Sequence, residues 1–111
     1  MERVTDYRAL IETWLLQQSQ IQPINSDIEV QTIFDRARDR YLLVDLGWDG
    51  HRRVYNCVFH LEIKDGKIWI QRNQTDKRVA EELLEMGVAK EDIVLGLQPS
   101  YVREYTGFGV A

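Results

Sequence analysis

Two Asp-Gly pairs, each set between runs of alternating apolar and polar residues, constrain the fold more than any other feature of this sequence. They are Asp49-Gly50 and Asp65-Gly66. A two-residue type I′ turn needs positive φ at both central positions, which Asp-Gly readily adopts, so each pair predicts a β-hairpin. Two hairpins in succession predict three consecutive antiparallel strands at the centre of a β-meander.

Counting outward from each turn gives the register that the strands are expected to adopt. The expected pairs are Ile63 with Ile68, Leu61 with Ile70, Glu62 with Trp69, Val44 with Tyr55 and Leu42 with Cys57. A slip of one residue would turn every side chain to the other face of the sheet, so apolar matches at both turns support this register.

Three further segments complete the expected fold. Residues 28–35 alternate with a period of two and predict the first of four strands, ahead of a charged loop at 36–40. A second helix begins near Thr75 or Asp76, either of which can cap it, and stops at Gly87. An N-terminal helix is indicated by apolar residues at three- and four-residue steps, namely Val4, Tyr7, Leu10, Ile11, Trp14 and Leu15.

Between the N-terminal helix and the first strand, Pro23 disfavours helical geometry, so residues 22–27 are interpreted as a connection. The 111 residues suffice for one core, and we expect a single domain over 1–111. The expected class is α+β: an N-terminal helix, a four-stranded antiparallel meander, a C-terminal helix packed on one sheet face, and a short structured tail.

The expected alternation divides the strand residues between two faces. The face to be covered by the helices carries Val30, Phe34, Leu42, Val44, Tyr55, Cys57, Phe59, Leu61, Ile63, Ile68 and Ile70. The opposite face mixes apolar with polar side chains, and either the protein's own C-terminal tail or a partner must cover it. As a partner interface, formed with another protein or a second copy, we single out Ile33, Tyr41, Leu43, Val58, Trp69, Tyr101, Tyr105 and Phe108.

Composition excludes several classes of function. The net charge of -4 opposes the nucleic-acid backbone and disfavours DNA binding by this chain alone. No apolar stretch approaches the roughly 20 residues that cross a bilayer. Cys57 is the single cysteine and cannot form an internal disulfide, and residues 1–6 lack the apolar run of a signal peptide, so we expect a cytoplasmic protein.

No complete set of catalytic, cofactor-binding or metal-ligating residues is visible. Cys57 and His60 fall on opposite sides of a regularly alternating strand, which makes a nucleophile and base pair geometrically poor. Asp45 with Glu62 and Lys64 imitates a nuclease metal motif, but the expected register separates the two carboxylates by roughly 27 Å. We expect no enzyme activity, no cofactor and no metal.

Two groups of arginines are candidates for phosphate contact. Arg36, Arg38 and Arg40 lie in the first loop beside Asp35 and Asp39, while a second group, Arg52 and Arg53, follows Asp49-Gly50. Because acidic residues accompany the first group, a solvated charged loop is favoured over a phosphate site.

Long runs of the sequence, in order, resemble one family. They are YR at 7–8, VQTIFD at 30–35, RRVYNCVFH at 52–60, IKDGKIWIQ at 63–71, EMGV at 85–88 and EDIVLG at 91–96. Together these runs extend over essentially the whole chain. They resemble the XisI-like family of fdxN-element excision controlling factors of cyanobacteria.

The resemblance implies a role in programmed excision of a DNA element from a nitrogen-fixation gene during heterocyst differentiation. A separate site-specific recombinase performs the chemistry, and the implied partner is a companion XisH-like protein of endonuclease-like fold. The resemblance supplies no catalytic residues. A DNA-contacting specificity factor, and a partner-binding module unrelated to excision, are the alternatives.

Overall fold

The computed structural model describes residues 2–21 and 27–110, with the backbone alone for residues 2–5. Most of the connection expected at residues 22–27 therefore lies outside the described residues. Helix α1 (Glu2–Ser19) is followed by four antiparallel strands, β1 (Ile28–Asp35), β2 (Arg40–Asp49), β3 (Arg52–Lys64) and β4 (Lys67–Asn73). Helix α2 (Val79–Glu85), the 3-10 turn η1 (Lys90–Asp92), strand β5 (Ile93–Val94) and helix α3 (Ser100–Arg103) complete the chain.

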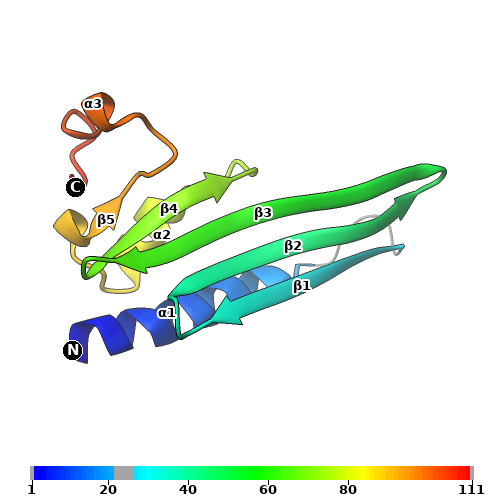
Figure 1. The fold of residues 1–111 in the computed structure, drawn as a ribbon, viewed down its shortest axis with the longest axis horizontal. Helices are drawn as coiled ribbons and strands as arrows, with labels where there is room; N and C mark the ends of the chain where they lie inside the picture. Colours follow the sequence, from blue (N-terminus) through cyan, green and yellow to red (C-terminus); the bar gives the residue numbers. More distant parts are fainter. Residues whose placement is uncertain (1, 22–26, 111) are drawn as a thin grey trace.

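The sheet has the order β1-β2-β3-β4-β5 and is mixed, because β5 pairs with β4 in parallel (Figure 1). The class α+β, the N-terminal helix and the four antiparallel strands are confirmed. The expectation that the sheet is a purely antiparallel meander of four strands is wrong. Only two residues form β5, too short a segment to show a periodic pattern in the sequence.

The two turns of the meander differ. At the second turn Asp65 and Gly66 both have positive φ and Lys64 pairs with Lys67, as predicted. At the first turn Asp49 pairs with Arg52, so Gly50 and His51 occupy the turn. Only Gly50 has positive φ there, as in a type II′ turn. Tyr55 consequently lies opposite Leu46 rather than the predicted Val44.

A β-bulge at Val58 reverses the faces of two strands relative to the prediction. Leu43 pairs with Phe59 while Val44 pairs with Cys57, so one extra residue is inserted in β3. Because an inserted residue inverts the alternation, the side chains along the whole of β2, and those of β3 from Arg52 to Cys57, face the side opposite to the predicted one. The side chains that β2 directs at the helices are therefore those of Tyr41 and Leu43, and not those of Leu42 and Val44.

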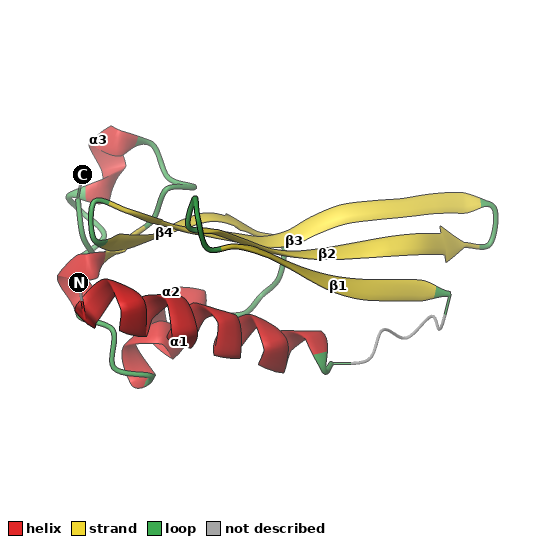
Figure 2. Cartoon of the chain, turned by 60° about the horizontal axis from the view of Figure 1, so that its bottom comes forward, coloured by secondary structure: helices red, strands yellow, loops and turns green. Residues whose placement is uncertain are grey.

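The core lies between this face of the sheet and helices α1 and α2, which Figure 2 shows on the same side. Trp14 is central to it, because its ring meets Phe59 edge-on at 4.9 Å and its Nε1 donates to Glu82 of α2 at 2.9 Å. The Tyr7 hydroxyl donates to buried Asp92 at 2.7 Å and joins α1 to η1. The described helices include none that is long and apolar enough to cross a membrane.

Helix α2 begins later than predicted and ends where predicted. Thr75 donates to Asn73 instead of capping a helix, and the first helical residue is Val79. Gly87, with φ of 103°, follows the last turn, and the next residue, Val88, donates its N–H to the carbonyl of Leu83 at 3.1 Å. This Schellman arrangement satisfies carbonyls that the helix end leaves without partners.

Candidate partner interface

The face of the sheet opposite α1 and α2 is covered over β4 by the chain's own C-terminal tail (Figure 2). Trp69 is only 7% exposed, and the centre of its ring lies 4.8 Å from the Lys64 ammonium and 5.1 Å from the Arg103 guanidinium. The Leu97 N–H donates to the Ile70 carbonyl at 3.0 Å and fixes the tail to β4. The expectation that the tail covers this face is confirmed here.

Over β1, β2 and β3 the same face carries apolar side chains that no described segment covers. Its most exposed large side chains are Ile33 at 45%, Trp48 at 50% and Tyr55 at 67%. Half-buried Leu42 and Leu46 lie on the same face, and the Arg53 guanidinium lies 5.5 Å from the centre of the Trp48 ring. We call Ile33, Leu42, Leu46, Trp48 and Tyr55 the open patch. Contiguous exposed apolar patches commonly mark interaction sites.

The structure separates the residues predicted for a partner interface. Ile33 lies in the open patch. Tyr41 and Leu43 are buried at 0% and 3% exposure in the core beneath α1, and Val58 packs against that core. Their assignment to the free face is therefore corrected, and the cause is the bulge. Trp69 lies on the predicted face but beneath the tail.

The aromatic residues of the tail also differ in exposure. Tyr101 and Tyr105 are 75% and 80% exposed and remain available to a partner. Phe108 is half-buried against the main core, with the Lys90 ammonium 5.5 Å from its ring centre. Trp48 and Tyr55 were missed as interface candidates because regular alternation placed them on the helix side. Only recognition of the bulge would have revealed them.

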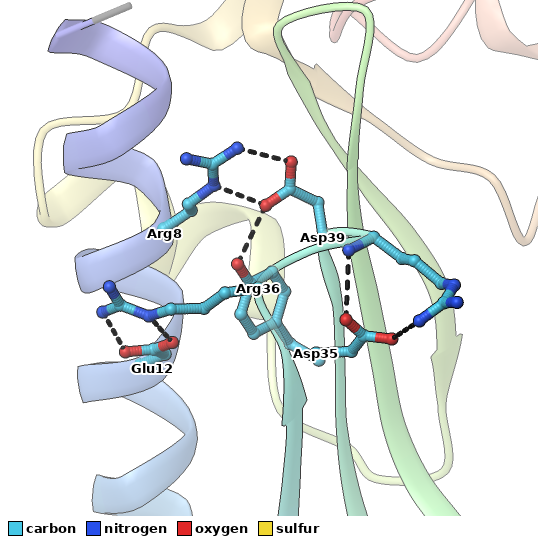
Figure 3. Close-up of polar contacts among 7 residues, drawn as sticks. Arg8, Glu12, Asp35, Arg36 and Asp39 are labelled. Atoms are coloured by element: carbon cyan, nitrogen blue, oxygen red, sulfur yellow. Dashed lines mark hydrogen bonds and ion pairs between the residues drawn. The ribbon is translucent and has the colours of Figure 1, made fainter.

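The first arginine loop is held by acidic residues (Figure 3). Arg36 donates two hydrogen bonds to Glu12 of α1, at 2.6 and 2.7 Å. Arg8 of α1 binds Asp39 through Nε and Nη2, and Tyr41 donates to the same carboxylate at 3.0 Å. These contacts fasten the β1–β2 turn to α1.

The remaining arginines of this region have acidic neighbours as well. Arg38 donates to Asp35 at 3.2 Å, and Arg40 lies 3.7 Å from Glu62. With their charges paired, the loop arginines are less available to phosphate than a free basic patch would be. This supports the prediction of a solvated charged loop over a phosphate site.

The same pairs shift the acidity of their carboxyl groups. Hydrogen bonds from Arg36 hold the pKa of Glu12 below its usual value, and those from Arg8 do the same for the pKa of Asp39. Burial, helped by the Asp39 carboxylate, raises the pKa of the Tyr41 hydroxyl. Tyr41 therefore stays a neutral hydrogen-bond donor at physiological pH.

Cys57 and His60 lie on the same face of the sheet, contrary to the prediction. The bulge pairs Cys57 with Val44 and His60 with Leu42, which share a face. The thiol nevertheless has no activating partner among the described residues, since it donates to the Phe59 carbonyl at 3.3 Å and its pKa is raised by burial. A raised pKa keeps the sulfur protonated and weakly nucleophilic.

The carboxylates of the nuclease-like motif are far apart in the sheet. Asp45 pairs with Asn56 and faces the helix side, whereas Glu62 lies six positions beyond Asn56 on the other face. Within residues 2–21 and 27–110 no group of three or more His, Cys, Asp or Glu side chains is arranged to hold a metal ion.

Comparison with solved structures gives two near matches from Anabaena variabilis ATCC 29413. A XisI-like protein superposes with a TM-score of 0.93 at 48% identity, covering 97% of this chain and 99% of that chain. The fdxN element excision controlling factor XisI superposes with a TM-score of 0.85 at 33% identity, covering 98% and 99%. A comparison with curated proteins finds no match.

These structures define a class of small α+β proteins. The fold described above superposes on them over nearly the whole length of the chain. The family described as XisI protein matches residues 1–110. The chain belongs to the XisI family, so the resemblance drawn from its sequence is confirmed.

Proposed function

We propose that this chain is a non-enzymatic accessory factor in the control of DNA-element excision, and that it acts by binding a companion protein through the open patch. Family membership supports the process, because one solved relative is named as an excision controlling factor. The companion is the XisH-like protein that the family resemblance implies, and the recombinase chemistry resides elsewhere.

The proposal rests on a contrast between two parts of one face of the sheet: the C-terminal tail covers the part over β4, and no described segment covers the part over β1, β2 and β3. Trp69 is 7% exposed beneath the tail, whereas Trp48 and Tyr55 on the same face are 50% and 67% exposed. Aromatic residues with apolar bodies and polar tips are favoured anchors of protein interfaces. The loop arginines, paired with carboxylates, favour a protein partner over DNA as the first contact.

Co-purification with the XisH-like companion encoded nearby tests the proposal. We expect Tyr55→Asp and Trp48→Asp each to lower the retained companion at least tenfold, because a charge placed in an apolar interface is costly to desolvate. Leu16→Asp is the matched control, since Leu16 is 47% exposed on α1, away from the patch. Undiminished retention by both patch variants would exclude the open patch.

Two further measurements separate the alternatives. Tyr105→Asp reports whether the exposed tail, rather than the open patch, binds the companion. A mobility shift at low salt reports direct DNA contact. Salt-sensitive retention of element-end DNA by the wild-type chain alone would favour a DNA-contacting specificity factor. Absence of companion binding by the wild type would contradict the proposal itself.

A further inference from the structure

The two edges of the sheet are protected to different degrees. Strand β5, at one edge, has two residues, and a bridge between Val94 and Gly109 occupies its outer side. Strand β1, at the other edge, has eight residues and pairs with β2 over its whole length without a bulge. None of the strands in the described part of the chain pairs with the outer side of β1. A long, regular edge strand is a template for pairing with another strand.

Strand β1 also lacks the side chains that usually keep an edge strand from pairing. Its sequence, IEVQTIFD, contains no proline, lysine or arginine. Its two acidic residues, Glu29 and Asp35, stand near its two ends. Ile28, Val30 and Phe34 are only half-buried, so apolar surface stays accessible along the outer side of the strand. Proteins block edges that must stay unpaired, which indicates that this edge is occupied in the functional protein.

The hydrogen-bond pattern of the sheet shows which backbone groups of β1 face outward. The Trp48 N–H donates to the carbonyl of Asp27, one position before β1, at 3.3 Å. Hydrogen-bonded pairs alternate with unbonded pairs along antiparallel strands, so the odd-numbered residues of β1 bond to β2. The even-numbered residues, from Ile28 to Phe34, therefore direct their N–H and carbonyl groups away from β2.

We propose that β1 pairs antiparallel with β1 of a second copy of the chain, about a two-fold axis perpendicular to the sheet. The outward groups match when even-numbered residues of the two copies lie opposite each other. An axis at Gln31 achieves this along the strand and pairs Ile28 with Phe34 and Val30 with Thr32 between the copies. Aromatic and β-branched residues in opposite positions stabilise a sheet, and these pairs bring no like charges together.

The charges at the two ends of β1 favour an antiparallel second copy. The start of the strand carries the acidic Asp27 and Glu29. Residues 35–40, at its end, carry three arginines against two aspartates, and Arg8 and Glu12, which contact this turn from α1, cancel each other. Two-fold pairing brings the acidic start of each strand toward the arginine-rich turn of the other. Each bonded guanidinium still has further N–H donors to offer.

This arrangement places both copies of α1 on one side of the joined sheet and both open patches on the other, because a perpendicular axis keeps the faces of the sheet aligned. The proposal goes beyond the proposed function, since it assigns an occupant to the edge of the sheet. It leaves the open patch of each copy accessible to the companion.

Sedimentation velocity of the full chain over a range of concentrations tests the dimer. Thr32→Pro removes an outward N–H and leaves the bonds to β2 in place, whereas Thr32→Val keeps that N–H and serves as the matched control. We expect a wild-type dimer whose dissociation constant rises at least about tenfold in Thr32→Pro and stays unchanged in Thr32→Val. A wild type that is monomeric at every concentration overturns the proposal. So does undiminished dimerisation by a Thr32→Pro variant that circular dichroism shows to be folded.

Disulfide cross-linking tests the register and does not depend on the folding of the proline variant. In a Cys57→Ser chain, Gln31→Cys places two thiols opposite each other at the axis, where the Cα atoms of an unbonded pair lie about 4.5 Å apart. Glu29→Cys in the same chain is the control, because its two copies lie about 13 Å apart along the strands. We expect a disulfide-linked dimer from Gln31→Cys alone on mild oxidation. Equal cross-linking of both variants, or of neither, overturns the proposal.

Co-purification keeps the dimer separate from the proposed function. If the wild type retains no companion, the proposed function fails and sedimentation still decides the dimer. If the wild type is monomeric and Thr32→Pro loses the companion that Thr32→Val retains, a strand of the companion pairs with β1 in place of a second copy. That result overturns the dimer.

Discussion

The two ends of the sheet differ in how much of the chain covers them. At the β4 end, α1 and α2 lie on one face and the C-terminal tail on the other, so the strands are buried from both sides (Figure 2). At the other end β2 and β3 continue to the turn at Gly50 and His51, and one face there carries exposed apolar side chains that no described segment covers. The covered end holds most of the core, whereas the projecting end has exposed apolar residues, at which we propose that a partner binds.

Two tryptophans give the sharpest test of this contrast. Trp14 is 1% exposed and contacts Phe59 and Glu82, whereas Trp48 is 50% exposed at the open end. We expect Trp14→Ala to lower the free energy of unfolding by about 3–5 kcal/mol and Trp48→Ala by about 1 kcal/mol or less. Urea unfolding followed by circular dichroism measures both. Equal losses would show that the open end is as integral to the fold as the core.

The tail depends on a close backbone approach at Gly109. A Cβ at this position would lie 2.3 Å from the Glu91 carbonyl oxygen, and the Gly109 N–H donates to the Ile93 carbonyl at 2.7 Å. We expect Gly109→Ala to cost about 1–3 kcal/mol and to release the tail from Trp69. A red shift of tryptophan emission in the folded state reports that release. Val110→Ala, outside this contact, serves as the control.

The contacts between α1 and the first loop predict a dependence on pH. Because the folded pKa of Asp39 and Glu12 lies below the unfolded value, their stabilisation is complete above the unfolded pKa of about 4. It is lost as the pH falls through the folded pKa. We expect Asp39→Asn and Glu12→Gln to be less stable than the wild type at pH 7 and to lose less stability between about pH 5 and 2. Chemical unfolding at several pH values measures this.

The smallest effects are expected from the two cation–π contacts, beginning with Arg103 over the Trp69 ring. We expect Arg103→Gln to lower stability by about 0.5–1 kcal/mol, the range of a cation–π contact near the surface. Arg53→Gln removes the equivalent contact from Trp48 at the open end, where both groups are exposed. A smaller loss there, measured in the same urea series, would agree with the contrast between the two ends. A larger loss would reverse it.

The most accurate predictions from the sequence were those of features that depend only on neighbouring residues, such as turns and helix ends. Asp65-Gly66 and the register around it were correct because the turn type specifies which residues pair. The helix end at Gly87 was correct for the same local reason. At the first turn Gly50 lies in a different type of turn. The observed pairing of β2 with β3 is therefore shifted by two residues from the predicted pairing.

What could not be predicted comes from departures from regular alternation. The bulge at Val58 has no signature in the apolar pattern, yet it moves Tyr41 and Leu43 into the core and exposes Tyr55. The candidate site was affected most, since each of its strand residues was assigned by alternation. The parallel pairing of β5 depends on contacts between distant segments, which local patterns do not reveal.

The parallel strand β5 also affects what happens while the protein is being made. All four antiparallel strands precede β5 and the tail in the chain, so they leave the ribosome first. Until β5 follows, β4 is an uncovered edge strand to which other unfolded chains can add, and until residues 95–110 follow, the face of β4 that carries Trp69 is uncovered as well. Docking of the tail therefore covers the face of β4 that carries Trp69. Chains that end before Gly96 would leave that face exposed.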